Sequence, residues 1–353
     1  MPILQADQLR RLGRNIFAAA GATEEEARIV SDALVEANLE GHDSHGVVRV
    51  PEYVGWVEKK LINCGAHIRV VEESDAFALL DGDWGWGQVV GKEAMNVAIA
   101  KAAKAGVGTI SVRQCGHLGR AGDYVLMAAQ RGMAAIMFLN THGAGRIVAP
   151  WGGRERRLSA NPIAMAVPRA SGKPILVDIS TCAIAGGKVT VAYNSKKSIP
   201  PNCPMDAEGR PSTNPKDFVE PPRGALLPMA GHKGFALALM CDILAGGLSG
   251  AGCSRPEATR IGNSFLAVVF DIGRFRDRQT FDADVDGLVD YVLSSQLAPG
   301  FSEILIPGEP EQRERARRER EGIAVDDQTW SEIWATAKRY GVTIDDGSVG
   351  RPH

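Results

Sequence analysis

The chain has 353 residues, 40 of them Lys or Arg and 42 Asp or Glu, which leaves a formal net charge of −2 at pH 7. A near-neutral balance argues against a nucleic-acid-binding protein, since such proteins carry a basic patch or a high isoelectric point. No uncharged apolar run reaches the ~18 residues of a membrane helix, and the first residues lack the pattern of a signal peptide. The six cysteines form no CxxC pair. We therefore expect a cytoplasmic protein with reduced thiols.

The first sixty residues predict three helices. Apolar residues recur at helical spacing over residues 8–20 and stop at Gly21. Thr23 and Glu26 form a capping box ahead of the next apolar face, which predicts a second helix ending near Leu39. A third helix is predicted over residues 49–60, after a short HDSHG turn.

From about residue 76 the pattern changes to alternating strands and helices. This alternation predicts an α/β fold in which helices cover a sheet. The predicted strands cover residues 76–80, 108–112, 134–139, 163–167, 175–177 and 265–270. The predicted helices cover residues 89–105, 121–131 and 234–248, and the last of these is apolar nearly all round, so we expect it to be buried between layers.

The remaining segments complete the predicted organisation. Residues 194–230 are rich in proline and poor in periodicity, which indicates an extended excursion. The mixed charges of residues 309–321 predict a solvated helix, and a last helix follows over residues 330–340. We expect residues 1–75 and 300–353 to form one helical domain, with an α/β domain over residues 76–299.

Glycine is abundant, at 40 residues, which raises the question of a dinucleotide-binding loop. The best candidate, Gly85 to Gly91, follows a predicted strand and precedes a helix. A Rossmann fingerprint also needs an acidic residue at the end of the next strand, and Val112-Arg113-Gln114 supplies none. A P-loop pattern is absent too, so any nucleotide site here differs from both familiar loops.

The first chemical cluster is His42-Asp43-Ser44-His45-Gly46, followed by Arg49 and Tyr53. A histidine is the usual proton carrier near pH 7, and an arginine one turn on offers a planar fork for a carboxylate. The alternative is that Asp43 and Ser44 cap the next helix and the histidines are surface residues. A zinc site on His42 and His45 would need further ligands that the neighbouring sequence does not provide.

Two further glycine-flanked basic turns precede predicted helices. They are Cys115-Gly116-His117-Leu118-Gly119-Arg120 and Gly231-His232-Lys233-Gly234. A helix N-terminus beside a cation favours an anionic group, although each turn alone is also typical of an ordinary helix start. Hydrolase chemistry fits poorly because no GxSxG motif occurs. The residues alone indicate an α/β enzyme with a histidine acid/base, a carboxylate-binding arginine and an anionic cofactor.

Several long motifs occur in an order that resembles the malate/L-lactate dehydrogenase family, whose members lack a Rossmann domain. The motifs are GHDSHGVVRVPEY, CGHLGRAGDY, VAPWGGRERRLSANPIAMAVPR, VDISTCAIAGGKV, GHKGFALALMCDILAGGLSGA and ILIPGE. The resemblance implies a homodimer with a non-Rossmann α/β domain that holds NAD, or alternatively NADP. It also implies hydride transfer between that cofactor and a 2-hydroxy or 2-oxo acid such as malate, lactate or a larger hydroxycarboxylate.

The resemblance assigns roles residue by residue. His117, His45 and Ser44 are the implied catalytic residues, and His117 or His45 takes the proton. The implied substrate-binding residues are Arg49, Tyr53 and Asn161. The implied cofactor-binding residues are Asn140, Asp178, Ile179, Ser180, Lys233, Gly308 and Glu309, and no metal is implied.

Two positions depart from the family pattern. Cys182 stands where a serine is usual, and Lys188 stands where the imine reductases of the family place an acid. The lysine favours hydroxy-acid chemistry over cyclic imino-acid (ketimine) reduction, which stays open as an alternative. A catalytically silent cofactor-binding protein is the other alternative, and the shared presence of His45, Arg49, His117 and Lys233 speaks against it.

Overall fold

The structure is a computed structural model that describes residues 1–170, 172–194 and 196–343. Its centre is a seven-stranded mixed sheet in the order β2-β3-β4-β10-β5-β6-β7. Only β3 and β4 run parallel, and every other neighbouring pair is antiparallel. In spatial order the strands are β2 (Arg69–Glu73), β3 (Phe77–Gly85), β4 (Val107–Cys115), β10 (Asn263–Phe270), β5 (Ala134–Asn140), β6 (Ile163–Val167) and β7 (Ile175–Ile179). The predicted α/β class is confirmed.

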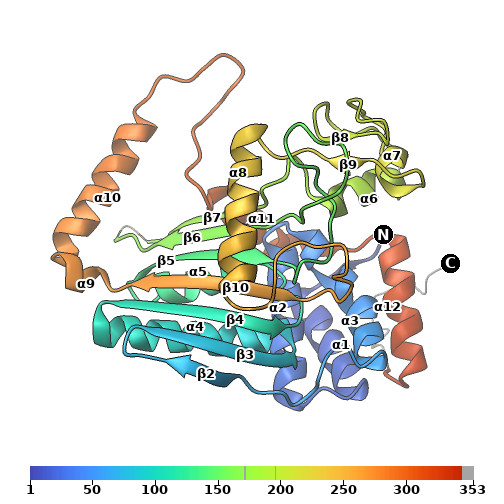
Figure 1. The fold of residues 1–353 in the computed structure, drawn as a ribbon, viewed down its shortest axis with the longest axis horizontal. Helices are drawn as coiled ribbons and strands as arrows, with labels where there is room; N and C mark the ends of the chain where they lie inside the picture. Colours follow the sequence, from blue (N-terminus) through green and yellow to red (C-terminus); the bar gives the residue numbers. More distant parts are fainter. Residues whose placement is uncertain (171, 195, 344–353) are drawn as a thin grey trace.

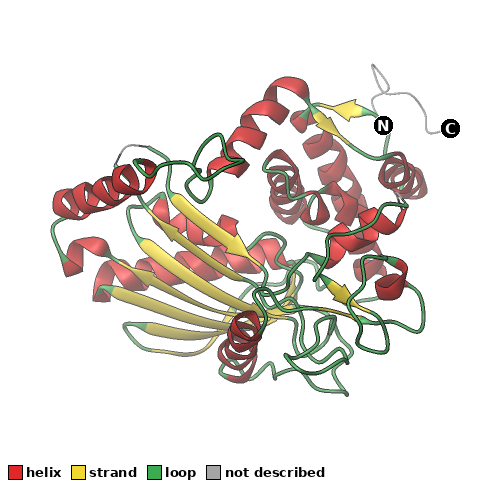
Figure 2. Ribbon diagram, turned by 90° about the horizontal axis from the view of Figure 1, so that it is seen from above, coloured by secondary structure: helices red, strands yellow, loops and turns green. Residues whose placement is uncertain are grey.

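Helices cover both faces of this sheet (Figures 1 and 2). On one face, α4 (Gly87–Ala105) packs on β3 and β4, and α5 (Gly122–Ala129) packs on β5 and β6. The other face carries α8 (His232–Cys241), which continues as a π-helical segment, Asp242–Gly247, against β5 and β10. The apolar side chains of β3, β4, β10 and β5 form the main core with α4 and α5.

The two ends of the chain pack together beside the sheet. A second core joins α1 (Ala6–Ala19), α2 (Glu24–Leu39), α3 (Val50–Glu58) and α12 (Asp327–Arg339). Strand β1 (Ile3–Leu4) pairs with β11 (Ile323–Ala324), and α11 (Glu309–Glu321) lies against α2. The predicted capping box holds the start of α2, since the Thr23 and Glu26 side chains each bond the other's backbone N–H. Strand β2 also comes from the first 75 residues, so the sheet takes in part of the segment expected to be helical.

Helix α6 (Gly186–Asn194) precedes the proline-rich excursion, whose described residues form short elements. These are β8 (Pro204–Met205), α7 (Lys216–Val219) and β9 (Ala225–Leu226). After the sheet come α9 (Ile272–Phe275) and α10 (Arg278–Leu293), which the sequence did not predict. Helix α10 projects away from the rest of the chain in Figure 1, and its Tyr291 is 78% exposed.

One prediction about burial is wrong for the single chain. Helix α8 was expected to be buried between layers, but its outward face is open to solvent. Leu237, Leu239 and Met240 are 40%, 42% and 49% exposed, respectively. The helix is apolar on both faces, whereas the sheet covers only one of them.

Candidate active site

The residues before α3 are held in two consecutive 3₁₀ turns, Asp43–His45 and Val47–Arg49. The buried Asn38 side chain on α2 fixes both turns, because its Oδ1 accepts the Val47 N–H at 2.8 Å and its Nδ2 donates to Asp43 Oδ1 at 2.6 Å. Gly46 is required there, since a Cβ would lie 2.2 Å from Asn38 Oδ1. The HDSHG turn is therefore a rigid platform that presents Ser44 and His45.

His117 lies on the loop that follows β4, facing this platform. Its ring stacks on that of His45, with centroids 5.7 Å apart and an interplanar angle of 15°. Its Nδ1 lies 2.7 Å from the Tyr53 hydroxyl, and Gln88 Nε2 donates to the same hydroxyl at 3.1 Å. The Trp56 ring packs edge-on at 6.3 Å. The structure thus brings together the histidines of two sequence motifs that lie more than 70 residues apart.

The glycines of the Gly85–Gly91 run serve close packing in this structure. A Cβ on Gly87 would lie 2.1 Å from the His117 carbonyl oxygen. A Cβ on Gly91 would lie 2.4 Å from the ring of Tyr124 on α5. The run that resembled a dinucleotide loop therefore positions the His117 loop against α4.

Burial keeps both histidines neutral. It lowers the pKa of His45 to about 3, with the nearby positive charge of Arg49 as the next cause. The pKa of His117 is lowered well below its usual value by the same two causes in the same order. His45 Nδ1 lies 3.0 Å from the Ser44 hydroxyl. Two neutral imidazoles beside one guanidinium can accept a proton from a ligand bound between them.

Arg49 is anchored at one side and open at another. Its Nε donates to the Ser44 carbonyl at 2.7 Å, and its Nη1 donates to Glu52 at 2.6 Å. Among the described residues no partner occupies Nη2. The anchoring fixes the guanidinium beside the histidines, where it can meet a carboxylate.

The surroundings of Tyr53 in the structure differ from those expected of a substrate-binding residue. Its side chain is only 1% exposed, and its hydroxyl is shared by His117 and Gln88. Burial raises its pKa well above the usual range, so the hydroxyl stays protonated. The sequence does not point to Gln88, because its hydrogen bond to Tyr53 depends on how α4 packs against α3.

Asn140 and Asn161 are both fully buried. The Asn140 amide donates to Asp242 at 3.0 Å and to the Gly252 carbonyl at 3.1 Å, and its oxygen accepts the His142 N–H at 3.1 Å. The Asn161 amide donates to the Ala238 carbonyl at 2.9 Å. Both side chains tie β-sheet loops to α8 and the segment that follows it.

The other predicted cofactor residues line the end of β7 and its neighbours. Asp178 and Ile179 close β7, and Ser180 follows, where it accepts the Cys182 thiol at 3.1 Å. Lys233 is exposed in the first turn of α8. Gly308 precedes α11, and the Glu309 carboxylate accepts the Ile306 N–H at 3.0 Å.

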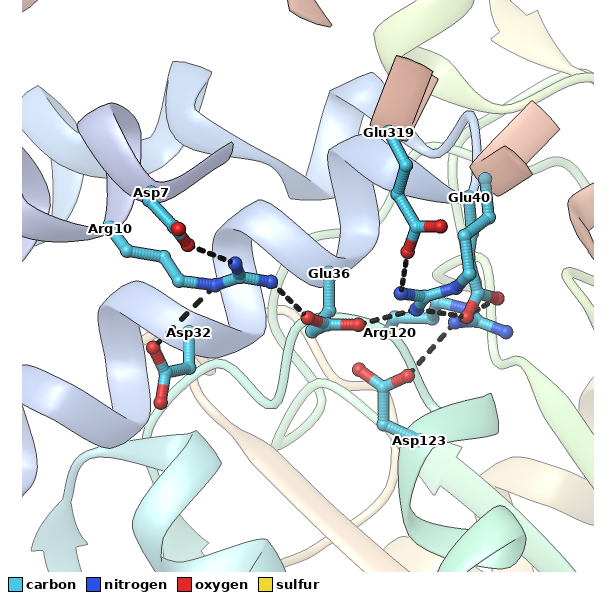
Figure 3. A network of polar contacts seen from close by, with 9 residues as sticks. Asp7, Arg10, Asp32, Glu36, Glu40, Arg120, Asp123 and Glu319 are labelled. Carbon is cyan, nitrogen blue, oxygen red and sulfur yellow. Dashed lines mark hydrogen bonds and ion pairs between the residues drawn. The ribbon is translucent and has the colours of Figure 1, made fainter. Parts of the chain in front are cut away.

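A network of charged side chains joins the segment before α5 to α2, α11 and α1 (Figure 3). Arg120 is 3% exposed and pairs with Glu40 and with Asp123, the latter at 2.9 Å. Its Nε lies 3.9 Å from Asp178 Oδ2, which accepts the Gly122 N–H at 2.7 Å. Burial raises the pKa of Asp123 to about 7. The network continues through α11 to α1 by way of Arg315, Glu36 and Arg10.

The described residues show neither a metal-binding cluster nor a membrane-spanning helix. No group of three or more His, Cys, Asp or Glu side chains within them is placed to hold a metal ion. None of the helices in the described ranges is long and apolar enough to cross a membrane.

Comparisons with known proteins agree with one another across nearly the whole chain. The model of the family described as malate/L-lactate dehydrogenase matches residues 4–334. L-sulfolactate dehydrogenase of Methanocaldococcus jannaschii is 37% identical over 352 residues, covering 98% of this chain and 99% of the relative. Hydroxycarboxylate dehydrogenase B of Escherichia coli is 35% identical over 342 residues, covering 96% and 94%.

Solved structures show the same likeness in three dimensions. A putative malate/lactate dehydrogenase from E. coli superposes with a TM-score of 0.93 at 34% identity, covering 98% of this chain and 97% of the other. A Δ1-piperideine-2-carboxylate reductase from Pseudomonas syringae pvar. tomato gives 0.83 at 30% identity, covering 96% and 100%. This chain belongs to the malate/L-lactate dehydrogenase family.

Proposed function

We propose that the protein is an NAD(P)-dependent oxidoreductase that interconverts a 2-hydroxy acid and a 2-oxo acid. The observation that carries the proposal is the arrangement of His117, His45 and Arg49, which places a neutral base beside a fixed guanidinium. Relatives named as malate, lactate and sulfolactate dehydrogenases support it.

His117 is the proposed acid/base. In the oxidation direction, its Nε2 takes the proton of the substrate hydroxyl, which requires that its Nδ1 carry a hydrogen and donate it to Tyr53 Oη. The Tyr53 contact at 2.7 Å fixes the ring, and in the proposed tautomer the Tyr53 hydroxyl oxygen accepts from both His117 Nδ1 and Gln88 Nε2. In the reduction direction, the imidazolium returns the proton to the carbonyl oxygen. His45 and Ser44 border the same space and orient the substrate.

Arg49 has a double effect in this proposal. Its guanidinium binds the substrate carboxylate, which holds C2 in place for hydride transfer. Its charge is also a cause of the low pKa of His117. When a carboxylate neutralises that charge, the pKa of His117 rises, so substrate binding itself makes the base better able to accept a proton.

The residues at the end of β7 and the starts of α8 and α11 fit a nicotinamide dinucleotide. Asp178 and Glu309 offer carboxylates for ribose hydroxyls, while Lys233 and the N–H groups of the first turn of α8 suit a pyrophosphate. Gly308 has a φ of +98°, and a Cβ there would lie 3.3 Å from Leu176, so this turn excludes a side chain. The bound cofactor would accept or supply the hydride at its nicotinamide ring.

A substrate panel tests the proposal. Purified protein is given pyruvate, oxaloacetate, phenylpyruvate or 2-oxoglutarate with NADH or NADPH, and cofactor oxidation is followed by absorbance. His117→Gln lowers kcat by about 10²–10⁴, the usual contribution of a positioned acid or base, while His67→Gln, at an exposed position, leaves it unchanged. The absence of turnover over the whole panel would refute the proposal.

Cyclic imino-acid reduction is the second candidate. The likeness to Δ1-piperideine-2-carboxylate reductase supports it, and α6 reaches the site, since a Cβ on Gly187 would lie 2.7 Å from Ser44 Cβ. The next residue is Lys188, whose positive charge would repel a protonated imine. Faster turnover of an imino acid than of the matching 2-oxo acid would favour this candidate.

We also propose that the protein is a homodimer. The open apolar face of α8 continues into Ile243 and Leu248, which are 45% and 61% exposed. A second copy covering this face would remove a contiguous apolar surface from water. Sedimentation or light scattering of the purified protein would give the mass of one chain if this proposal is wrong.

A further inference from the structure

A separate cavity of about 370 Å³ opens at the ends of β3 and β4, on the side of the sheet that carries the loop before β10. Its walls come from β3, β4, the segment after β5 and residues 250–260, and it shares no residue with the His117 site. Its volume is at the lower end of the range for small-molecule sites.

Three arginines face this cavity, namely Arg113, Arg255 and Arg260. Arg113 is paired with the buried Asp81 at 3.1 Å. Within the described ranges no carboxylate lies within 4.0 Å of the guanidinium of Arg255 or Arg260. Of the described residues that form the wall, Glu257 is the one acidic residue, and it is exposed. With Asp81 and Glu257 counted, the group carries a net charge of +1.

Arg260 is held in a way that leaves hydrogen-bonding capacity unused. Its guanidinium carbon lies 3.6 Å from the ring centroid of Trp84, and its Nη2 donates to the Leu61 carbonyl at 2.8 Å. Its Nε is buried and has no hydrogen-bond partner in the part of the chain that the structure describes. A stacked, partly anchored guanidinium loses little side-chain entropy when it binds an anion.

The wall is built on strained backbone. Trp84, Gln114 and His142 have φ angles of 56°, 52° and 54°, in the left-handed region that is unfavourable for a non-glycine residue. The Gln114 N–H donates to His142 Nε2 at 3.0 Å, and the His142 ring packs on Trp84. Such strain concentrates at functional sites, where the surrounding structure maintains it.

We propose that this cavity binds a small dianion, a dicarboxylate or phosphate, through Arg113, Arg255 and Arg260. The unpaired guanidinium groups supply charge-assisted hydrogen bonds, and the rigid Trp84–His142 wall shapes the space beside them. Because Arg260 also bonds the Leu61 carbonyl just beyond α3, a bound anion links the sheet to the helix that carries Tyr53. The site is distinct from the carboxylate position at Arg49.

Calorimetric titration of the purified protein with inorganic phosphate or succinate tests the proposal without cofactor or oxo acid. Wild type should bind at least one probe with a Kd near or below about 1 mM. Arg255→Gln, which removes an exposed side chain that among the described residues bonds only the Cys253 carbonyl, should weaken binding about 10-fold. Glu257→Gln should tighten it about twofold by removing a like charge. Arg276→Gln, at an exposed ion pair on α9–α10, is the matched control and should leave binding unchanged.

Three outcomes would overturn the proposal. The first is that wild type binds neither probe. The second is that Arg255→Gln and the double variant Arg255→Gln/Arg260→Gln bind as wild type does. The third is that Arg49→Gln abolishes binding, because the anion would then occupy the dehydrogenase site. If wild type binds neither probe and Arg255→Gln changes the oligomeric state, the proposal is overturned and the cavity is assigned to a contact between subunits.

Discussion

Tyr53→Phe isolates the group that orients the proposed base. The change removes one oxygen, which the structure places 2.7 Å from His117 Nδ1 and 3.1 Å from Gln88 Nε2, at a position only 1% exposed. A hydrogen bond to a charged group contributes about 1.5–3 kcal/mol. His117 is charged after it has taken the proton, so the variant loses this hydrogen-bond free energy from the stabilisation of the imidazolium-like transition state. Since 1.36 kcal/mol corresponds to a tenfold rate change, we expect kcat to fall by about 10- to 100-fold.

The assay is steady-state turnover of the best 2-oxo acid over a range of pH, together with urea denaturation. In Tyr53→Phe the pKa of the pH–rate profile should move down, since the imidazolium has lost its acceptor. Tyr124→Phe is the matched control, because that buried hydroxyl donates to the Leu118 carbonyl at 2.5 Å and does not touch His117. Both variants should lose stability, but only Tyr53→Phe should change the profile. Equal profiles in the two variants would refute the orienting role of Tyr53.

Three further predictions concern charge. Arg49→Gln should lower kcat/KM by about 10²-fold or more through the lost carboxylate contact; normal kcat/KM would remove Arg49 from the site. His45 and His117 are neutral when folded and protonate near pH 6.5 when unfolded, so the unfolded state binds more protons below that pH. Stability should therefore fall by up to about 2 kcal/mol per histidine from pH 7 to pH 5, and urea midpoints for His45→Asn should show a shallower fall. Arg120→Met leaves Asp123 without its cation and Glu40 with Arg315 alone, and should cost about 3–5 kcal/mol. The exposed Arg276→Met should cost less than about 1 kcal/mol, and equal denaturation midpoints would contradict this reasoning.

Local patterns predicted the elements that depend on local physics. The capping box of Thr23 and Glu26 gave the start of α2 correctly, and the apolar runs predicted as strands over residues 134–139 and 163–167 became β5 and β6. Helix α10 was missed because its apolar residues, such as Leu288 and Tyr291, face solvent in the single chain and follow no core-facing stripe. The burial of α8 was mispredicted for the converse reason, since composition shows an apolar helix but not what covers each face.

The site residues fall into the same two groups, those that local sequence patterns reveal and those that depend on tertiary packing. The histidine-containing turns could be found in the sequence because glycines and polar side chains cluster there. The contact between Tyr53 and His117 could not, since it joins residues 64 positions apart and depends on how α3 and α4 pack. The cavity of Arg255 and Arg260 gave no signal at all, because its aromatic wall, Trp84, comes from a strand end about 170 residues earlier.

Arg49 links substrate binding to proton transfer, and the two effects can be separated by charge and shape. Its charge lowers the pKa of His117, whereas its fork fixes the carboxylate. A lysine at this position keeps the charge but loses the planar fork. Arg49→Lys should therefore raise KM while the pH–rate profile of kcat/KM keeps its position, and Arg49→Gln should raise KM and also shift the free-enzyme pKa upward. If both variants leave that pKa unchanged, the guanidinium does not act on His117, and the base owes its low pKa to burial alone.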